Sequence, residues 1–216
     1  MKYLLIALIL VSGCKSTSYF NTSNDVARQK SILYLRNKDT IAGEISVIME
    51  TSLHANVTYP SAIEFTPEGK SIKQNIPLDD VVGYRIGTVF YALKKVDIHM
   101  NGINRLLFLK QLTPDHSKIQ LYELFESGNG NDTGEREYSY YLSLQGLGPI
   151  ETINTRSSKI MPLFEEKMSK IVADCPALAE KIRLKEKGYF IPFVTFSIKK
   201  HPEVLLRIIN EYNNCR

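Results

Sequence analysis

Residues 40–49 read TIAGEISVIM, and this stretch decides the fold class. Its apolar positions recur at every second residue: Ile45 and Val47 fall on one face, while Glu44 and Ser46 fall on the other. Because successive side chains of a strand point to opposite faces, a period of two predicts a half-buried β-strand. The stretch therefore predicts a sheet that has one face against a core.

The same period extends outward from this stretch over the whole segment from Ser31 to Ile153. The other alternating segments are 63–65, 82–86, 89–93, 96–100, 119–126 and 138–144. Turn residues separate them, at Asn37–Asp39, Pro67–Lys70 and Asn101–Gly102. Residues 127–135, SGNGNDTGE, indicate a flexible loop. Short strands joined by hairpins predict an antiparallel sheet, either a curled barrel or a sandwich.

After Ile153 the apolar period changes to that of a helix. The stripe Leu163, Phe164, Met168, Ile171 and Val172 predicts a first helix, with Pro162 in its first turn. Asp174 is predicted to cap a second helix that starts at Cys175–Pro176 and ends at Gly188. The last helix is predicted from Pro202 to Tyr212.

These helices are too short to be stable alone, so we expect them to pack on the sheet or on one another. Residues 189–198 lean toward extended structure, and Pro192 restricts them to an edge strand or an extended cover. The predicted fold class is therefore α+β, with an antiparallel sheet followed by about three C-terminal helices.

The N-terminus has the pattern of an export signal. Lys2 precedes the apolar run Tyr3–Val11, which is about half of the roughly 20 residues that a spanning helix needs. The sequence Val11-Ser12-Gly13-Cys14 then resembles the bacterial lipobox. This resemblance implies cleavage between Gly13 and Cys14, and acylation of Cys14.

The residues after Cys14 bear on location and reach. Lys15 stands where an aspartate would favour retention at the inner membrane, so the outer membrane is favoured, with the domain facing the periplasm. Residues 15–29, KSTSYFNTSNDVARQ, show no period and are predicted to be a tether that reaches about 20 Å. The expected division is a signal peptide at 1–13, a tether at 14–29, a β-rich domain at 30–154 and a helical part at 155–216.

Composition narrows the function classes. The chain has 216 residues, a formal net charge of +4 and 44% hydrophobic residues. That charge is too small to indicate a nucleic-acid partner, and three cysteines are too few for a disulfide-dense scaffold. We expect an ordinary globular body that no apolar helix carries across a membrane.

Motifs for catalysis or metal binding are not evident in the sequence. The four histidines, His54, His99, His116 and His201, have no metal-ligand spacing. Residues 129–134 lack the initial Asp of a calcium loop, and position twelve of such a loop would be Tyr140 instead of Glu. Asp79–Asp80 fits a turn or cap better than a shared proton. We therefore expect no catalytic residues, no metal and no cofactor.

Two aromatic clusters and two cysteines remain as candidates. The clusters are Tyr138, Tyr140 and Tyr141, and Tyr189, Phe190, Phe193 and Phe196. Such rings either pack in a core or stack against a sugar or peptide. Once Cys14 carries lipid, Cys175 and Cys215 remain, and an oxidising compartment would allow them to pair. The alternative is that Cys175 is a buried hydrophobe and Cys215 a free terminal thiol.

Several segments resemble a loose group of exported lipoproteins of Bacteroidota with no assigned activity. They read LRNKDTIAGEI (35–45), IEFTP (63–67), PLDDVVGYRIG (77–87), DCPALAEKI (174–182) and LLRIINEYNNC (205–215). The resemblance implies an envelope location and a β-then-α order, and it carries no activity.

The sequence thus favours a non-enzymatic envelope lipoprotein, held at the membrane by its lipid, that binds an unknown protein, glycan or lipid partner. A lipocalin-like carrier of an apolar ligand and an enzyme with a site assembled from scattered residues are the alternatives. A hollow barrel would favour the carrier, and converging His, Asp or Glu residues would favour the enzyme.

Overall fold

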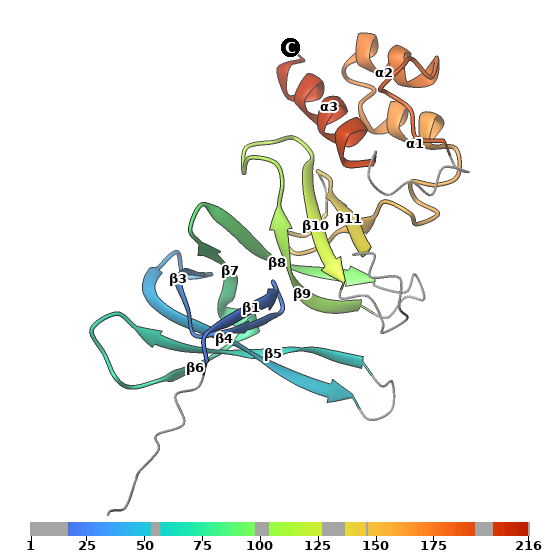
Figure 1. Ribbon diagram of the computed structural model, residues 1–216. Coiled ribbons are helices and arrows are strands. Elements are labelled where there is room, and N and C mark those ends of the chain that lie inside the picture. The colour runs from blue at the N-terminus through green and yellow to red at the C-terminus, as the bar shows by residue number, and fades with distance from the viewer. Residues whose placement is uncertain are drawn as a thin grey trace, which may run out of the picture.

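The computed structural model describes residues 17–52, 57–97, 104–126, 137–145, 147–192 and 201–215. Helices and strands follow the predicted β-then-α order (Figure 1). The strands are β1 (Tyr19–Thr22), β2 (Asp25–Ala27), β3 (Gln29–Leu35), β4 (Thr40–Ser52), β5 (Val57–Pro67), β6 (Gln74–Pro77), β7 (Val81–Ile86), β8 (Val89–Asp97), β9 (Asn104–Gln111), β10 (Gln120–Glu126), β11 (Glu137–Ser143) and β12 (Ile153–Asn154). The helices are the 3₁₀ turn η1 (Leu78–Asp80), α1 (Phe164–Ile171), α2 (Pro176–Arg183) and α3 (His201–Asn214).

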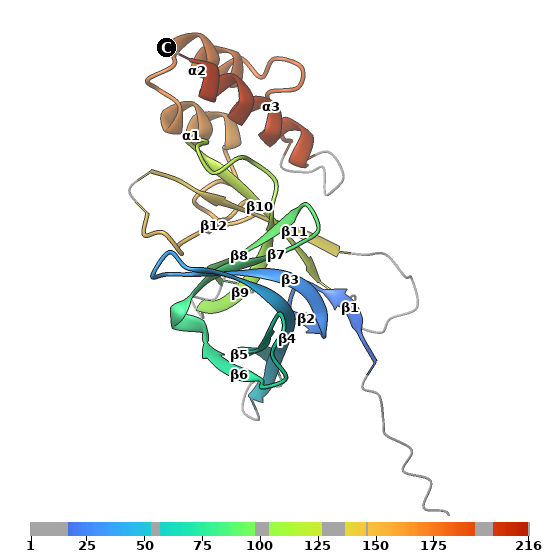
Figure 2. The ribbon, with the colours of Figure 1, turned by 90° about the vertical axis from the view of Figure 1, so that its left-hand side faces the viewer.

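Ten of the strands form one antiparallel sheet in the order β12-β11-β10-β9-β8-β7-β3-β4-β5-β6. Within the described residues this sheet is open, with β12 and β6 at its two edges. The α+β class is confirmed. In the part of the chain that the structure describes, the sheet is neither a closed barrel nor a sandwich of two separate sheets: it is one open sheet that folds over on itself (Figure 2). None of the described helices is long and apolar enough to cross a membrane.

The first core lies between β3–β6 on one side and β7–β9 on the other. Ile45 and Val47 of β4 point into it, as their alternation predicts. The ring of Phe65 lies across Gly43, where any Cβ would collide with it. Tyr84 and Phe108 fill the far side with rings 5.0 Å apart. The space inside the curl is thus packed with side chains.

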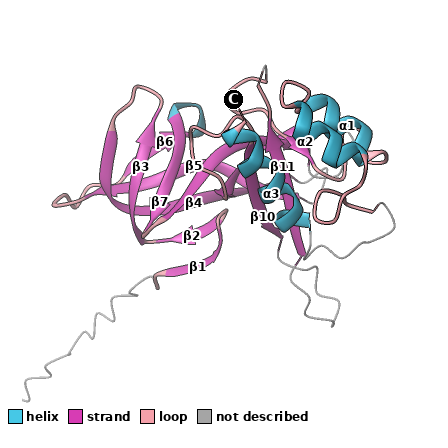
Figure 3. Cartoon of the chain, turned by 90° about the horizontal axis from the view of Figure 1, so that it is seen from above, coloured by secondary structure: helices cyan, strands magenta, loops and turns pink. Residues whose placement is uncertain are grey.

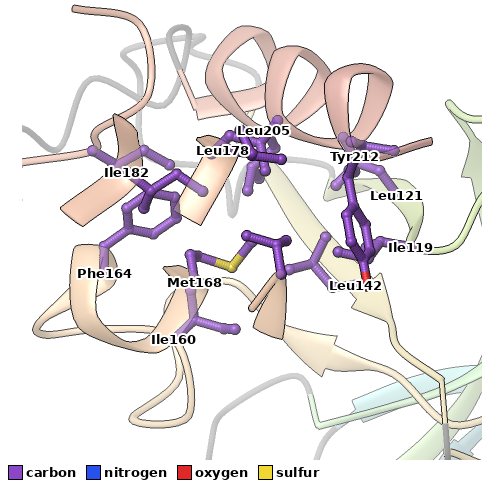
Figure 4. Packing of buried hydrophobic residues seen from close by; sticks show 14 of the residues in the cluster. Ile119, Leu121, Leu142, Ile160, Phe164, Met168, Leu178, Ile182, Leu205 and Tyr212 are labelled. Atoms are coloured by element: carbon purple, nitrogen blue, oxygen red, sulfur yellow. The ribbon is translucent and has the colours of Figure 1, made fainter. Parts of the chain in front are cut away.

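Two further cores follow along the sheet. The second is shared by β8–β9 and β10–β11, and Leu109, Tyr122 and Tyr141 are among its members. The third lies on the other face of β10–β11, where the helices cover it (Figures 3 and 4). In it, Phe164 and Met168 of α1 pack with Leu205 of α3. Because β10 and β11 are buried on both faces, apolar and polar residues do not alternate strictly along them.

The helices differ from the expected ones in detail. Leu163, predicted in the apolar stripe of α1, is exposed because it is the N-cap residue, one position before the helix. Asp174 does not cap α2: Cys175 occupies the N-cap, with Pro176 at the first helical position. Asp174 instead accepts a hydrogen bond from the hydroxyl of Tyr212, at 2.7 Å, and so joins the start of α2 to α3. The second helix ends at Arg183, before Gly188.

The expected tether is wrong for residues 19–27, which form the hairpin β1–β2. Val26 is buried in the first core, and Ser23 and Asn24 at the turn are also buried. Their polar groups bond to Tyr84 and Phe108, far along the chain. The sequence shows no apolar period here because buried hydrogen bonds, and not an apolar stripe, hold much of the hairpin in place.

The inward-facing residues of β7 also differ from the expected ones. Val82 and Tyr84 were expected on one inward face, but Val82 is exposed while Val81 and Tyr84 are buried. The register shifts between Tyr34 and Leu35 on the neighbouring strand, which is the mark of a β-bulge. The extra residue turns Val82 outward. The Pro67–Lys70 turn between β5 and β6 is confirmed, with Gly69 at φ 75°.

Candidate functional site

A cleft of about 290 Å³ opens on the outer side of β7 and β8, beside the bend between β9 and β10. Three cationic side chains and three aromatic rings line it: Arg36, Arg85, Lys94, Tyr34, Phe90 and Tyr122. They come from β3, from the turn after it, and from β7, β8 and β10, so the folding of the sheet brings them together. The only carboxylate among the described lining residues is Asp115.

Lys94 is the most unusual of these residues, because a lysine is only 7% exposed there. Its Nζ donates to the backbone carbonyl of Pro149 at 2.6 Å and lies 4.8 Å from the centre of the Tyr122 ring. Burial lowers the pKa of Lys94 to about 8; the charge of Arg36 also lowers it, and that of Asp115 opposes the shift. Lys94 is therefore a weakly hydrated cation at neutral pH.

Arg85 lies against two aromatic rings. Its guanidinium is 5.6 Å from the centre of the Tyr34 ring and 5.9 Å from that of Phe90, and the two rings meet edge to face at 5.2 Å. Gly83 makes this possible, since a Cβ there would strike the ring of Phe90. The Nε of Arg85 is buried and has no hydrogen-bond partner among the described residues.

The part of the lining that comes from β9, β10 and the loop between them is held by a chain of hydrogen bonds. Gln111 Nε2 donates to the Asp115 carboxylate at 2.7 Å. Gln120 Nε2 donates to the Asp115 backbone carbonyl at 2.9 Å, and the Tyr122 hydroxyl donates to Gln120 Oε1 at 2.5 Å. Burial raises the pKa of Tyr122 well above its usual range, so the hydroxyl keeps its proton. These bonds fix this part of the lining before any ligand arrives.

Arg36 is an exposed cation in the lining of the cleft, and η1 positions it. Its backbone N–H donates to Asp80 O at 2.9 Å, and its Nε donates to Asp79 O at 2.5 Å. The Asp79–Asp80 pair thus acts through its backbone carbonyls, in a turn, which agrees with the turn role predicted for it.

A larger hollow of about 590 Å³ lies over β4 and β5, but its charges are mostly paired. Arg28 is 3.5 Å from Glu44, and Lys73 is 2.6 Å from Glu64. These pairs are between largely solvent-exposed groups and contribute little. The smaller cleft is the better candidate, because it holds three cations against one carboxylate.

The structure also places the residues singled out from the sequence. Cys175 and Cys215 form a disulfide with Cα atoms 5.9 Å apart, which joins the start of α2 to the end of α3. Gly13, Cys14, His54, His99, the Asn101–Gly102 turn, residues 127–135, Phe193 and Phe196 lie outside the described residues. Only the backbone of His201 is described, as the first residue of α3, and His116 lies exposed beside the cleft. The described residues hold no group of three or more His, Cys, Asp or Glu arranged to bind a metal.

The predicted aromatic clusters serve mainly as packing. Tyr140 and Tyr141 are buried, and Tyr138 packs on Phe125 with ring centres 5.4 Å apart. Tyr189 and Phe190 pack against the third core. The aromatic rings of the cleft were missed; their signal was Tyr34 and Phe90 at outward positions of strands whose inward neighbours, Leu33 and Tyr91, are also apolar.

No family model, curated protein or solved structure matches this chain. The geometry of the described residues defines its class: an α+β protein with one open, folded antiparallel sheet, a helical cover and a cationic, aromatic cleft.

Proposed function

We propose that this protein is a lipid-anchored component of the bacterial cell envelope whose folded part binds an anionic ligand in the cleft of Arg85 and Lys94. The ligand class is a carboxylate or phosphate group carried by an envelope molecule. The role is binding, not catalysis. The proposed role agrees with the non-enzymatic binding module expected from the sequence, and the cleft of Arg85 and Lys94 is its proposed binding site.

The observation that carries the proposal is a pair of incompletely satisfied cations. Lys94 is buried and has a single carbonyl as its described acceptor, and the buried Nε of Arg85 has none. An unsatisfied buried donor costs about 1–3 kcal/mol, and more when it is charged. An anion in the cleft would supply the missing acceptors. Cations with such costs are concentrated at functional sites.

The contacts of Tyr34 and Phe90 with Arg85 also favour a binding site for an anion. The two ring centres lie 5.6 Å and 5.9 Å from the Arg85 guanidinium and hold it in one orientation, and no salt bridge joins Arg85 to a carboxylate among the described residues. An ion pair with Asp or Glu would neutralise the positive charge of the guanidinium. The cleft therefore presents oriented positive charge to an incoming anion.

The membrane anchor in this proposal comes from the sequence alone, from the lipobox at Val11–Cys14. The location that goes with it is the outer membrane, with the domain facing the periplasm. The Cys175–Cys215 disulfide supports an oxidising compartment, where such bonds persist. We rank the carrier of an apolar ligand lower, because Phe65, Tyr84 and Phe108 fill the interior in which such a ligand would lie.

Titration with inorganic phosphate and with acetate, followed by the backbone amide NMR signals of the mature domain, tests the binding proposal. We expect at least one of the two anions to shift the signals of Arg85, Lys94 and their neighbours. Lys94→Met should raise the dissociation constant of that anion by about tenfold, as expected when a charged hydrogen bond is lost. Lys70→Met, at the exposed turn after β5, is the matched control and should bind like the wild type. Absence of any shift, or equal binding by Lys94→Met, would overturn the proposal.

A further inference from the structure

The hairpin β1–β2 is fastened to the body of the protein at its turn. Asn24 Oδ1 accepts a hydrogen bond from the Phe108 N–H at 2.7 Å, and Ser23 Oγ donates to the Phe108 carbonyl at 2.5 Å. The Tyr84 hydroxyl donates to the Ser23 carbonyl at 2.6 Å. Since Ser23 and Asn24 are buried as well, the hairpin cannot swing away without breaking these bonds.

The base of the hairpin is tied down too. Ser18 Oγ donates to the Arg28 carbonyl at 3.1 Å, and Gln29 Nε2 donates to Ser18 Oγ at 2.7 Å. The Arg28 N–H donates to Ser46 Oγ of β4 at 3.0 Å. The described chain is therefore fixed to the sheet from Ser18 onward.

This leaves a short connection to the proposed lipid. Cys14 precedes Tyr19 by five positions. Even a fully extended chain spans at most about 3.6 Å per residue, so Tyr19 must lie within roughly 18 Å of the Cys14 Cα. A bilayer anchor on Cys14 would thus draw β1 itself to the membrane surface.

β1 carries the side chains that suit such a position. Tyr19 is 42% exposed and Phe20 is 40% exposed, although both are large and apolar. Tyr19 and Phe20 lie on the outer strand of the two-stranded sheet, and the ring of Phe20 rests on Tyr91 at 5.6 Å. Tyrosine, with an apolar ring and a polar hydroxyl, is enriched at membrane–water interfaces, and the apolar ring of a phenylalanine is buried there.

We infer that the outer edge of β1, with Tyr19 on one side of the strand and Phe20 on the other, forms a membrane-contact edge, which seats the domain directly on the bilayer that holds the Cys14 lipid. This inference rests on the anchor in the proposed function. The cover of helices then faces away from the membrane, because both ribbon views place α1, α2 and α3 at the end of the molecule far from β1 (Figures 1 and 2).

The chain contains no tryptophan, so a single introduced indole reports its own surroundings. The lipidated protein is made as Phe20→Trp and, separately, as Tyr19→Trp. Each is reconstituted in vesicles of phosphatidylethanolamine and phosphatidylglycerol that contain lipids spin-labelled near the headgroup. Leu184→Trp is the matched control, since Leu184 is 57% exposed and lies at the end of α2.

We expect tryptophan at position 20 or 19 to be quenched at least about twofold more strongly than tryptophan at position 184, as interfacial burial requires. Stronger quenching at either position supports the inference. Quenching at both positions no greater than at 184 overturns it. The mass of the N-terminal peptide separates the two proposals: protein without lipid on Cys14 refutes the anchor, whereas lipidated protein with unquenched tryptophan refutes only the membrane-contact edge.

Discussion

The side-chain amide of Asn24 hydrogen bonds with both backbone groups of Phe108, 84 positions away. It accepts from the Phe108 N–H at 2.7 Å and donates to the Phe108 carbonyl at 3.2 Å. Phe108 lies in the middle of β9, whose pairing with β10 involves only Lys110 and Gln111. One asparagine side chain thus replaces a strand neighbour and holds the N-terminal hairpin against the sheet.

Asn24→Ala should lower the free energy of unfolding by about 1–3 kcal/mol, because a buried N–H loses its partner. Urea unfolding of the mature domain measures this. Asn21→Ala is the control, since Asn21 is in the same hairpin and its described side-chain hydrogen bond, to the Asp25 carboxylate at 2.8 Å, is exposed to solvent. Equal stabilities of the two variants would contradict the structural role of Asn24.

A chain that starts at Lys30 should be much less stable than one that starts at Lys15. Removal of the hairpin exposes the part of the first core that Val26 covers. It also removes the hydrogen-bond partners that the hairpin gives to the Tyr84 hydroxyl and the Phe108 N–H. A loss of about 3 kcal/mol would lower the melting temperature by roughly 6–12 °C in a domain of this size. Calorimetry compares the two chains, and coincident melting would show that residues 15–29 are a free tether after all.

Cys175→Ser together with Cys215→Ser should destabilise the helical part. The disulfide closes a loop with a sequence separation of 40. The chain-entropy description gives such a cross-link up to roughly 4 kcal/mol. Thermal unfolding of the double variant and of the reduced wild type should agree. Two free thiols titrated in unreduced, denatured protein from the envelope would refute the bond.

The stability contribution of Lys94 should depend on pH. At neutral pH this lysine is charged in both the folded and the unfolded chain. Above a pKa of about 8 the folded chain loses the proton, while the unfolded chain keeps it up to the ordinary value of 10.5. The unfolded state then binds more protons, so the contribution of Lys94 to stability rises with pH across this window.

Lys94→Met isolates this effect, because methionine keeps the length of the side chain and removes its charge. The stability of the wild type relative to Lys94→Met should improve between about pH 7 and about pH 9.5. Lys70→Met, at an exposed position, should show no such trend. A difference between the wild type and Lys94→Met that stays constant with pH would mean that Lys94 is not desolvated.

Local periodicity predicted most of the fold. The alternation around Ile45 and Val47 and the glycine turn at Gly69 gave strands and a hairpin in the right places, because each signal lies within a few residues of the element that it specifies. The hairpin β1–β2 could not be predicted in this way. Its anchors are Ser23 and Asn24, whose partners are remote in sequence, and polar residues in such a stretch resemble those of a linker.

The cleft was hidden for a related reason. Arg85 faces Phe90 through the register of β7 and β8, and Tyr34 joins them through the register of β3 and β7, in which it pairs with Gly83. Lys94 reaches Pro149 because the chain returns across β8 after β11. Registers and chain returns are properties of the assembled sheet, so no single segment of the sequence carries them.

Export of Cys14→Ala in a bacterial host that is fed labelled fatty acid tests the central claim most directly. We expect the wild type to be cut, labelled and found in the membrane fraction, while Cys14→Ala stays an unprocessed and unlabelled precursor. Cys215→Ala, which removes a cysteine outside the lipobox, should still be cut and labelled. Normal processing and labelling of Cys14→Ala would contradict a lipid-anchored envelope protein.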